Sequence, residues 1–157
     1  MKSYTLIVSR NFPVTHPRKG QHTLFVESIE NCTKIHTIRA NFEYWNKAIT
    51  EVQKGYAYIS LRYWEGLPYK SKQVEFMKLC YTDNIGIEKL TFEKQLEEEY
   101  TALTGQPQFS YQSNIEIELL AKNDGLSLMD FYSWFAKYDL SKDMAIIHFT
   151  DFRYEKV

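Results

Sequence analysis

A short segment running from Lys34 to Arg39 gathers side chains that could do chemistry. It reads Lys-Ile-His-Thr-Ile-Arg, so an amine, an imidazole, a hydroxyl and a guanidinium follow one another closely. A lysine whose pKa is lowered by burial or by a neighbouring cation can act as the base for a hydroxyl nucleophile. Arg39 would be such a cation, or it could bind a carboxylate or phosphate in bidentate fashion. The alternative, which the pattern alone favours, is a half-buried strand with its polar residues in solvent.

The spacing of these residues sets a structural condition for any joint role. In a regular strand, Lys34 and His36 point to one face, whereas Thr37 and Arg39 point to the other. Lys34 and Thr37 can therefore meet only if Lys34 precedes the strand or lies at a bulge.

The rest of the chain predicts an α+β domain that would position this segment. Periodicity and β-propensity predict strands at Tyr4–Ser9, Lys34–Arg39, Tyr56–Trp64, Gln73–Cys80, Ile85–Phe92 and Ala145–Phe152. Helices are expected at Thr23–Cys32, at Asn41–Gln53 and after the N-cap Ser127. Glu93–Tyr100 is acidic and is expected to be a solvated helical turn or an excursion from the domain, and Gln106–Ser113 is expected to be a loop. Strands and helices do not alternate strictly, so a mixed or closed sheet fits better than a doubly wound parallel one.

The motif Lys34-x-x-Thr37-x-Arg39, together with this order of elements, resembles the ASCH domain, a family of small β-barrels related to PUA domains. The similarity includes the helix before the motif, the Lys-Gly turn before the strongest strand, a late Leu-Ser-Leu-x-Asp-Phe helix start and the closing strand. It covers most of residues 23–152, with 93–118 as an insertion. The resemblance implies one domain over residues 1–157, with an α+β fold of the PUA-like (ASCH-type) mixed β-barrel class and peripheral helices.

The resemblance also implies a function. ASCH-like modules suggest a pocket for RNA or a modified nucleoside around Lys34, Thr37 and Arg39, with His36 as a further contact. Some bacterial members are amidohydrolases that remove the acetyl group from acetylated cytidine. By position, Lys34 would then be the base, Thr37 the nucleophile and Arg39 an anchor or oxyanion partner. Asp124 stands where those enzymes have a glutamate.

Asp124 leaves two interpretations open. Its side chain is one methylene shorter than glutamate, so either the backbone approaches more closely or the relay is lost. Asn123-Asp124-Gly125 is also an ordinary turn sequence, and turn chemistry alone explains it. The leading hypothesis is therefore a module that binds RNA or a nucleoside, and the competing hypothesis is an amidohydrolase that acts on a modified nucleoside. A third possibility is a protein-interaction domain, in which Thr37 would be buried and bonded to backbone.

A second candidate region interleaves basic and aromatic residues between two predicted strands. Exposed rings there could stack on bases while cations contact phosphates, and the candidates are Arg62, Trp64, Tyr69 and Lys70. The alternative is a hairpin whose aromatic residues enter the core, which is slightly favoured because Glu65 lies among them.

The loop Asn11–Gly20 and its flanks are also basic. Arg18 and Lys19, with Arg10 and His16, could contact phosphate, although such a loop is more often a solvated connection.

The composition excludes several classes of protein. The 157 residues are 44% hydrophobic and 25% charged, and a net charge of −1 argues against bulk electrostatic binding of nucleic acid. No stretch reaches the ~20 apolar residues of a membrane span, and the N-terminal segment does not have the pattern of a signal peptide. We expect a cytoplasmic protein with no membrane partner. The two cysteines and four histidines lack zinc-like spacing, so neither a metal nor a cofactor is expected.

Overall fold

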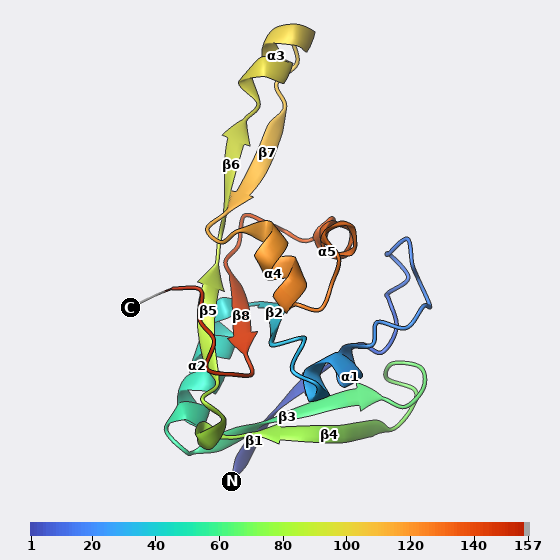
Figure 1. Cartoon of the computed structure of the whole chain (residues 1–157), viewed down its shortest axis with the longest axis vertical. Helices are drawn as coiled ribbons and strands as arrows, with labels where there is room; N and C mark the ends of the chain where they lie inside the picture. Colours follow the sequence, from blue (N-terminus) through green and yellow to red (C-terminus); the bar gives the residue numbers. More distant parts are fainter. Residues whose placement is uncertain (156–157) are drawn as a thin grey trace.

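The computed structural model describes residues 1–155 and is an α+β structure, as the sequence predicts (Figure 1). Its strands are β1 (Lys2–Ile7), β2 (His36–Ala40), β3 (Ala57–Trp64), β4 (Gln73–Leu79), β5 (Gly86–Leu90), β6 (Phe92–Leu96), β7 (Phe109–Ser113) and β8 (Met144–His148). Its helices are α1 (Phe25–Glu30), α2 (Phe42–Gln53), α3 (Glu98–Thr104), α4 (Ile117–Asn123) and α5 (Leu128–Phe135), with a 3-10 turn η1 at Tyr81–Asp83.

The strands of the described chain form separate open sheets. In the first sheet, of order β1-β3-β4, β1 runs parallel to β3 and β4 runs antiparallel to it. The second sheet, of order β2-β8-β5, is antiparallel throughout, and β6 pairs with β7 alone. A barrel needs a ladder that returns to its first strand. Within residues 1–155 no ladder joins the two three-stranded sheets, so the predicted barrel closure is wrong and only the α+β class stands.

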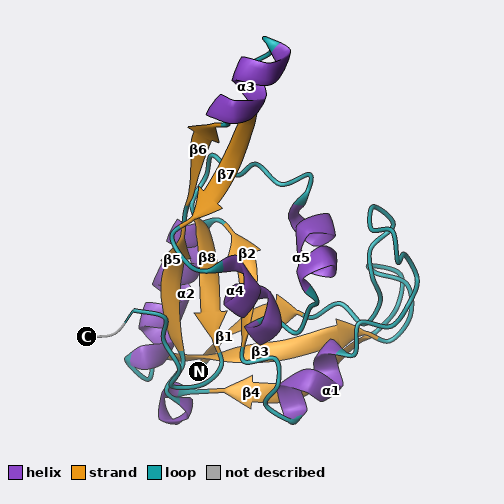
Figure 2. Ribbon diagram, turned by 45° about the horizontal axis from the view of Figure 1, so that its top comes forward, coloured by secondary structure: helices purple, strands orange, loops and turns teal. Residues whose placement is uncertain are grey.

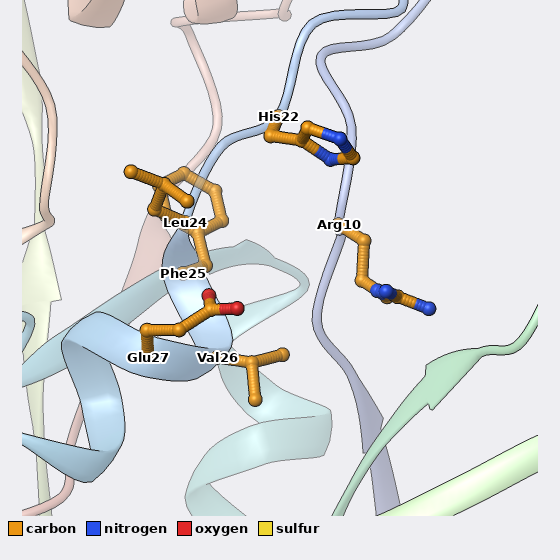
Figure 3. Close-up of a pocket in the computed structure, with 6 residues that line it drawn as sticks. All are labelled: Arg10, His22, Leu24, Phe25, Val26 and Glu27. Atoms are coloured by element: carbon orange, nitrogen blue, oxygen red, sulfur yellow. The ribbon is translucent and has the colours of Figure 1, made fainter.

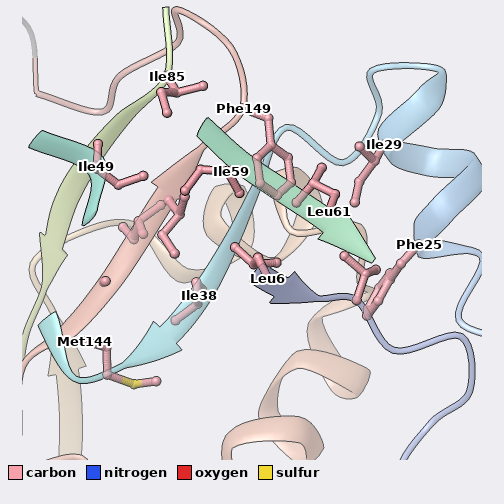
Figure 4. Packing of buried hydrophobic residues seen from close by; sticks show 14 of the residues in the cluster. Leu6, Phe25, Ile29, Ile38, Ile49, Ile59, Leu61, Ile85, Met144 and Phe149 are labelled. Atoms are coloured by element: carbon pink, nitrogen blue, oxygen red, sulfur yellow. The ribbon is translucent and has the colours of Figure 1, made fainter. Parts of the chain in front are cut away.

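The hydrophobic core lies where the first two sheets and α2 meet (Figure 4). Leu6, Ile59 and Leu61 contribute from the first sheet, and Ile38 and Met144 from the second. All of β8 is buried, because it is the central strand of its sheet. This burial explains why that segment reads as a continuous apolar run rather than an alternating one.

Two helix starts follow from local sequence. The Ser127 side chain accepts a hydrogen bond from the backbone N–H of Asp130 at 3.2 Å, as the capping pattern predicts. Asn41 caps α2 by accepting from the N–H of Tyr44 at 3.2 Å. The helix α4 was not predicted, because its apolar residues follow a polar stretch that resembles a loop.

The segment between β5 and α4 forms an arm that extends away from both larger sheets (Figures 1 and 2). It consists of the β6–β7 hairpin with α3 at its tip. The prediction of a helical turn at Glu93–Tyr100 is therefore wrong in its first half, and the predicted loop at Gln106–Ser113 contains β7. The reason is that these two polar stretches pair with each other, and hairpin pairing satisfies backbone groups that neither stretch could satisfy alone.

Candidate functional site

A cavity of about 270 Å³ opens beside the start of β2. Four residues of the predicted site, Lys34, Thr37, Arg39 and Asp124, lie in its wall. The remaining lining residues are mostly apolar or aromatic: Val8, Ser9, Pro13, Thr15, Phe25, Ile38, Trp134, Phe135 and Tyr138. The fold thus brings the residues of the motif together with an acidic side chain from the other half of the chain.

Lys34 lies ahead of β2, which meets the structural condition set by the spacing. After α1, Cys32 adopts a left-handed conformation with φ of 63°, and the N–H groups of Thr33 and Lys34 both donate to the carbonyl of Ser28. This turn redirects the chain before the strand begins at His36. Lys34 therefore does not follow the strand's alternation, and it shares the cavity with Thr37.

Asp124 is the C-cap of α4, and the end of this helix explains its position. The Leu126 N–H donates to the Ala121 carbonyl and the Gly125 N–H donates to the Lys122 carbonyl, the pair of bonds of a Schellman motif. Gly125 has a φ of +79°, which this motif requires. The turn interpretation of Asn123-Asp124-Gly125 is thus confirmed, and the same turn places Asp124 in the lining of the cavity.

Lys34 and Asp124 form a buried ion pair. The Lys34 ammonium donates to Asp124 Oδ1 at 2.8 Å and to the Asp124 main-chain carbonyl at 2.6 Å. Their side chains are only 3% and 5% exposed. The ammonium also lies 4.3 Å from the centroid of the Phe25 ring. The main-chain carbonyl of Asp124 therefore accepts a hydrogen bond from the lysine in addition to the one that the carboxylate accepts.

Burial controls the ionisation of this pair. It lowers the pKa of Lys34; the Asp124 carboxylate opposes that shift, and the nearby Arg39 adds to it. Burial alone would raise the pKa of Asp124, but the Lys34 ammonium and the His36 ring together hold it below its ordinary value. Asp124 is therefore ionised at neutral pH, while Lys34 loses its proton more readily than a solvated lysine.

Gly125 is required by its contact with Lys34 as well as by its backbone conformation. A Cβ at this position would lie 3.2 Å from Lys34 Cβ and 3.3 Å from Lys34 Cδ. We expect Gly125→Ala to destabilise the protein by about 1–2 kcal/mol, the usual cost of alanine in a left-handed conformation with added crowding. Chemical denaturation checks this value against Gly20→Ala, whose φ is +79° but whose Cβ would meet no atom within 4 Å. Equal losses in the two variants would show that the contact with Lys34 contributes nothing.

The hydroxyl of Thr37 and the guanidinium of Arg39 retain hydrogen-bonding capacity in the cavity wall. Thr37 is 6% exposed, and its hydroxyl has no hydrogen-bond partner within the described part of the chain. Arg39 donates from Nη2 to the carbonyl of Ile7 at 2.5 Å. Its Nε is buried and has no acceptor among residues 1–155. A ligand in the cavity could satisfy both groups.

His36, predicted as a ligand contact, does not line this cavity. It is fully buried behind the ion pair, with Nδ1 at 3.5 Å from Asp124 Oδ1 and Nε2 at 2.6 Å from the Tyr154 hydroxyl. Strand alternation explains this placement, because Thr37 and Arg39 face the cavity and His36 faces the other way.

The residues of the two predicted basic regions also lie outside the cavity lining. Arg62 donates to Ser60 Oγ at 2.8 Å and lies 3.8 Å from Glu75. Trp64 and Tyr69 pack together with their centroids 5.2 Å apart, and Tyr69 is 89% exposed. Lys70 is exposed at the tip of the β3–β4 hairpin.

In the N-terminal loop, Arg18 is already paired. It contacts Asp130 of α5 at 2.5 Å, whereas its neighbour Lys19 is exposed. Asp130 lies 112 residues after Arg18, so no local sequence pattern predicts this ion pair.

The aromatic wall of the cavity was not predicted as part of the site. Trp134 and Phe135 belong to an apolar stripe on α5 that resembles ordinary core. The stripe does pack inward at Phe131, but α5 ends at Phe135, so its last turn borders the cavity instead. No feature of the sequence shows which residues of the stripe pack in the core and which line the cavity.

A second hollow, of about 150 Å³, is also lined by Phe25 (Figure 3). Its wall contains the polar side chains of Arg10, His22 and Glu27 and the apolar side chains of Leu24 and Val26. Arg10, His22 and Leu24 are exposed, and a carboxylate and a guanidinium share the space. This mixture of charges on an open surface selects no particular ligand, so the larger cavity is the candidate site.

Residues 1–155 contain no cluster of three or more His, Cys, Asp or Glu side chains placed to hold a metal ion. In the same part of the chain, no helix has both the length and the hydropathy needed to cross a bilayer. Comparisons of this chain with protein-family models, with curated proteins and with solved structures find no match.

Proposed function

We propose that this protein binds a nucleoside, or a base exposed in RNA, in the cavity beside Lys34, Thr37 and Arg39, as an ASCH-like member of the PUA-like superfamily. One observation carries the proposal: these three residues and Asp124 share a single cavity with several aromatic side chains. The motif Lys34-x-x-Thr37-x-Arg39 supports the same assignment through its resemblance to that family.

The chemistry of the wall fits a nucleobase. Phe25, Trp134 and Tyr138 offer apolar and aromatic surface for a planar ring. Arg39 Nε–H is buried without an acceptor in the described chain, and a base carbonyl would provide one. The Asp124 carboxylate would accept from an exocyclic amine. The volume of about 270 Å³ is near the lower end of ligand clefts, so one nucleoside would enter and neighbouring nucleotides would stay outside.

A titration with cytidine and N4-acetylcytidine tests this proposal. Trp134 lies in the cavity wall, so its fluorescence is expected to change on binding. We expect Arg39→Met to weaken binding at least ~10-fold, because hydrogen bonds to charged groups contribute about 1.5–3 kcal/mol. Lys47→Met, on the exposed face of α2, removes a cation elsewhere and serves as the matched control. Absence of binding at millimolar nucleoside, or equal loss in both variants, would refute the proposal.

A second candidate function is hydrolysis of the amide in an acetylated nucleoside. It is favoured by the shared location of Lys34, whose pKa is lowered by burial, and Thr37, whose hydroxyl has no partner in residues 1–155. Lys34 in its neutral amine form, which its lowered pKa makes more accessible, would take the proton of the Thr37 hydroxyl as the threonine oxygen attacks the acetyl carbonyl. The C–N bond then breaks, the amine leaves with that proton, and water hydrolyses the threonine ester to acetate.

The geometry places one condition on this reaction. The Lys34 ammonium donates to Asp124, and no hydrogen bond links it to Thr37. Lys34 must therefore release one proton to solvent and turn from Asp124 toward the Thr37 hydroxyl before it can act as the base. The protein-interaction alternative is less well supported, because Thr37 is buried as it requires but has no backbone partner in the described chain.

Chromatography of N4-acetylcytidine after incubation with the protein distinguishes the two functions. If the protein is a hydrolase, wild type and Thr37→Ser should form cytidine, and the isosteric Thr37→Val should lose at least ~100-fold in rate because it lacks the nucleophile. Binding of both nucleosides without turnover would leave the binding function and remove the hydrolase.

A further inference from the structure

A buried polar network adjoins the proposed site on the side away from the cavity. It contains His36 and His148, which face each other across β2 and β8 with ring centroids 5.5 Å apart. Tyr154, from the C-terminal segment, lies within 5.7 Å of both rings, measured between centroids. Neither the binding role nor the hydrolytic role proposed above uses these residues.

The hydrogen-bond directions in this network depend on one another. His36 Nδ1 lies 3.5 Å from Asp124 Oδ1 and has no hydrogen-bond partner in the described chain. Asp124 is an acceptor only, so a bare lone pair on Nδ1 would face a negative charge, whereas an N–H there is attracted to it. His36 is fully buried, and burial lowers its pKa, which favours the neutral ring. The proton therefore belongs on Nδ1, and Nε2 is left as an acceptor.

Tyr154 completes the sequence of donors and acceptors. Its hydroxyl lies 2.6 Å from His36 Nε2 and accepts a hydrogen bond from the Asn123 side-chain amide at 3.1 Å. With Asn123 as donor, the tyrosine proton is free to be donated to His36. The direction is then consistent throughout: Asn123 to Tyr154, Tyr154 to His36, and His36 toward Asp124. Asp124 Oδ1 in turn accepts from Lys34 at 2.8 Å.

The C-terminal segment that carries Tyr154 is held in place by specific contacts. Glu88 of β5 accepts from the N–H groups of Tyr154 and Glu155 at 2.8 and 3.0 Å. Arg153 lies over Gly86, where a Cβ would collide with its guanidinium, and it donates to the carbonyl of Asn84 at 2.8 Å. These contacts fix the tyrosine hydroxyl against His36.

We propose that Tyr154 is a positioning residue of the nucleoside site: it holds His36 as the Nδ1–H tautomer, and His36 thereby holds the Asp124 carboxylate against Lys34. The C-terminal segment is on this view part of the site although it contacts no ligand. The effect of Tyr154 on affinity rests on the proposed nucleoside binding, whereas the Nδ1–H tautomer of His36 does not.

Long-range ¹H–¹⁵N correlation spectra of histidine test the tautomer directly in the full-length protein. In the wild type we expect His36 to carry its proton on Nδ1, with the Nε2 resonance shifted by an accepted hydrogen bond. In Tyr154→Phe, which removes one oxygen atom, the Nε2 resonance should move toward the position of a nitrogen without a donor. Tyr56→Phe, an exposed tyrosine, is the matched control and should leave both resonances unchanged.

The affinity for cytidine tests the consequence for the site. We expect Tyr154→Phe to weaken binding about two- to tenfold, the range for one net hydrogen bond, while Tyr56→Phe binds as the wild type does. The proposal would be overturned if His36 in the wild-type protein carried its proton on Nε2. This measurement is made on the wild type, so it does not depend on whether the Tyr154→Phe variant folds. A Tyr154→Phe variant with shifted Nε2 but unchanged affinity would also overturn it. If the wild type binds no nucleoside, the proposed function fails, while the His36 spectrum still decides the tautomer.

Discussion

Asp124→Ala should destabilise the folded protein by about 3–5 kcal/mol, the usual cost of leaving one member of a buried ion pair without its partner. The Lys34 ammonium is 3% exposed, and its acceptors in residues 1–155 are the carboxylate and the carbonyl of Asp124. Without the carboxylate, the ammonium must either stay charged in a poorly solvated position or lose its proton. Urea or guanidinium denaturation at pH 7 measures the loss.

A double variant separates the ion pair from simple packing. Lys34→Met with Asp124→Leu removes both charges and keeps apolar volume, so it should recover most of the stability that Asp124→Ala loses. The deficit of Asp124→Ala relative to the wild type should also shrink between pH 7 and 10, because the lysine can then be buried uncharged. A loss below ~1 kcal/mol at pH 7 would show that the pair is solvated in solution.

Acid should destabilise the protein in a window set by a histidine rather than by carboxylates. Burial lowers the pKa of His148 from 6.5 to about 4, with the nearby His36 and Arg153 acting in the same direction and Glu88 opposing them. The unfolded chain therefore binds a proton near pH 6.5, while the folded protein binds it only near pH 4. The stability present above pH 6.5 is lost as pH falls through this window, by an amount on the order of 3 kcal/mol.

Unfolding free energies measured at pH 7, 5.5 and 4.5 check this sign and window. His148→Gln should flatten the loss, although His36, whose pKa is also lowered by burial, should keep part of it. His22→Gln, on the exposed N-terminal loop, is the control and should follow the wild type. Stability that stays constant to pH 4.5 in the wild type would contradict the buried neutral state of His148.

Local sequence determined much of the secondary structure and the core of the site. The helix at Leu128–Phe135 has the predicted N-cap, Ser127, because a cap depends on side chains within one turn. The helix at Phe42–Gln53 lies within the predicted range Asn41–Gln53. The strand predicted at Lys34–Arg39 begins two residues later, at His36. Spacing gave only the condition that Lys34 must precede the strand if it is to meet Thr37, and the structure places it there.

Pairing between distant segments could not be predicted from either segment alone. The polar stretches 92–96 and 109–113 form strands because each satisfies the other's backbone, although neither looks like a strand alone. The barrel expected from the family resemblance is instead a set of open sheets, because register and closure depend on contacts that no single segment encodes.

The same division holds within the site. The chemical groups of the segment from Lys34 to Arg39 are evident from the sequence, and strand alternation predicts that Thr37 and Arg39 share a face. The tertiary structure decided that Asp124, 90 residues away, reaches Lys34, because the end of α4 and the small Gly125 let two backbones approach closely. It also placed Tyr154 behind His36. Side-chain type and spacing are local properties, whereas burial, and with it the pKa of Lys34, comes into being only when distant elements pack together.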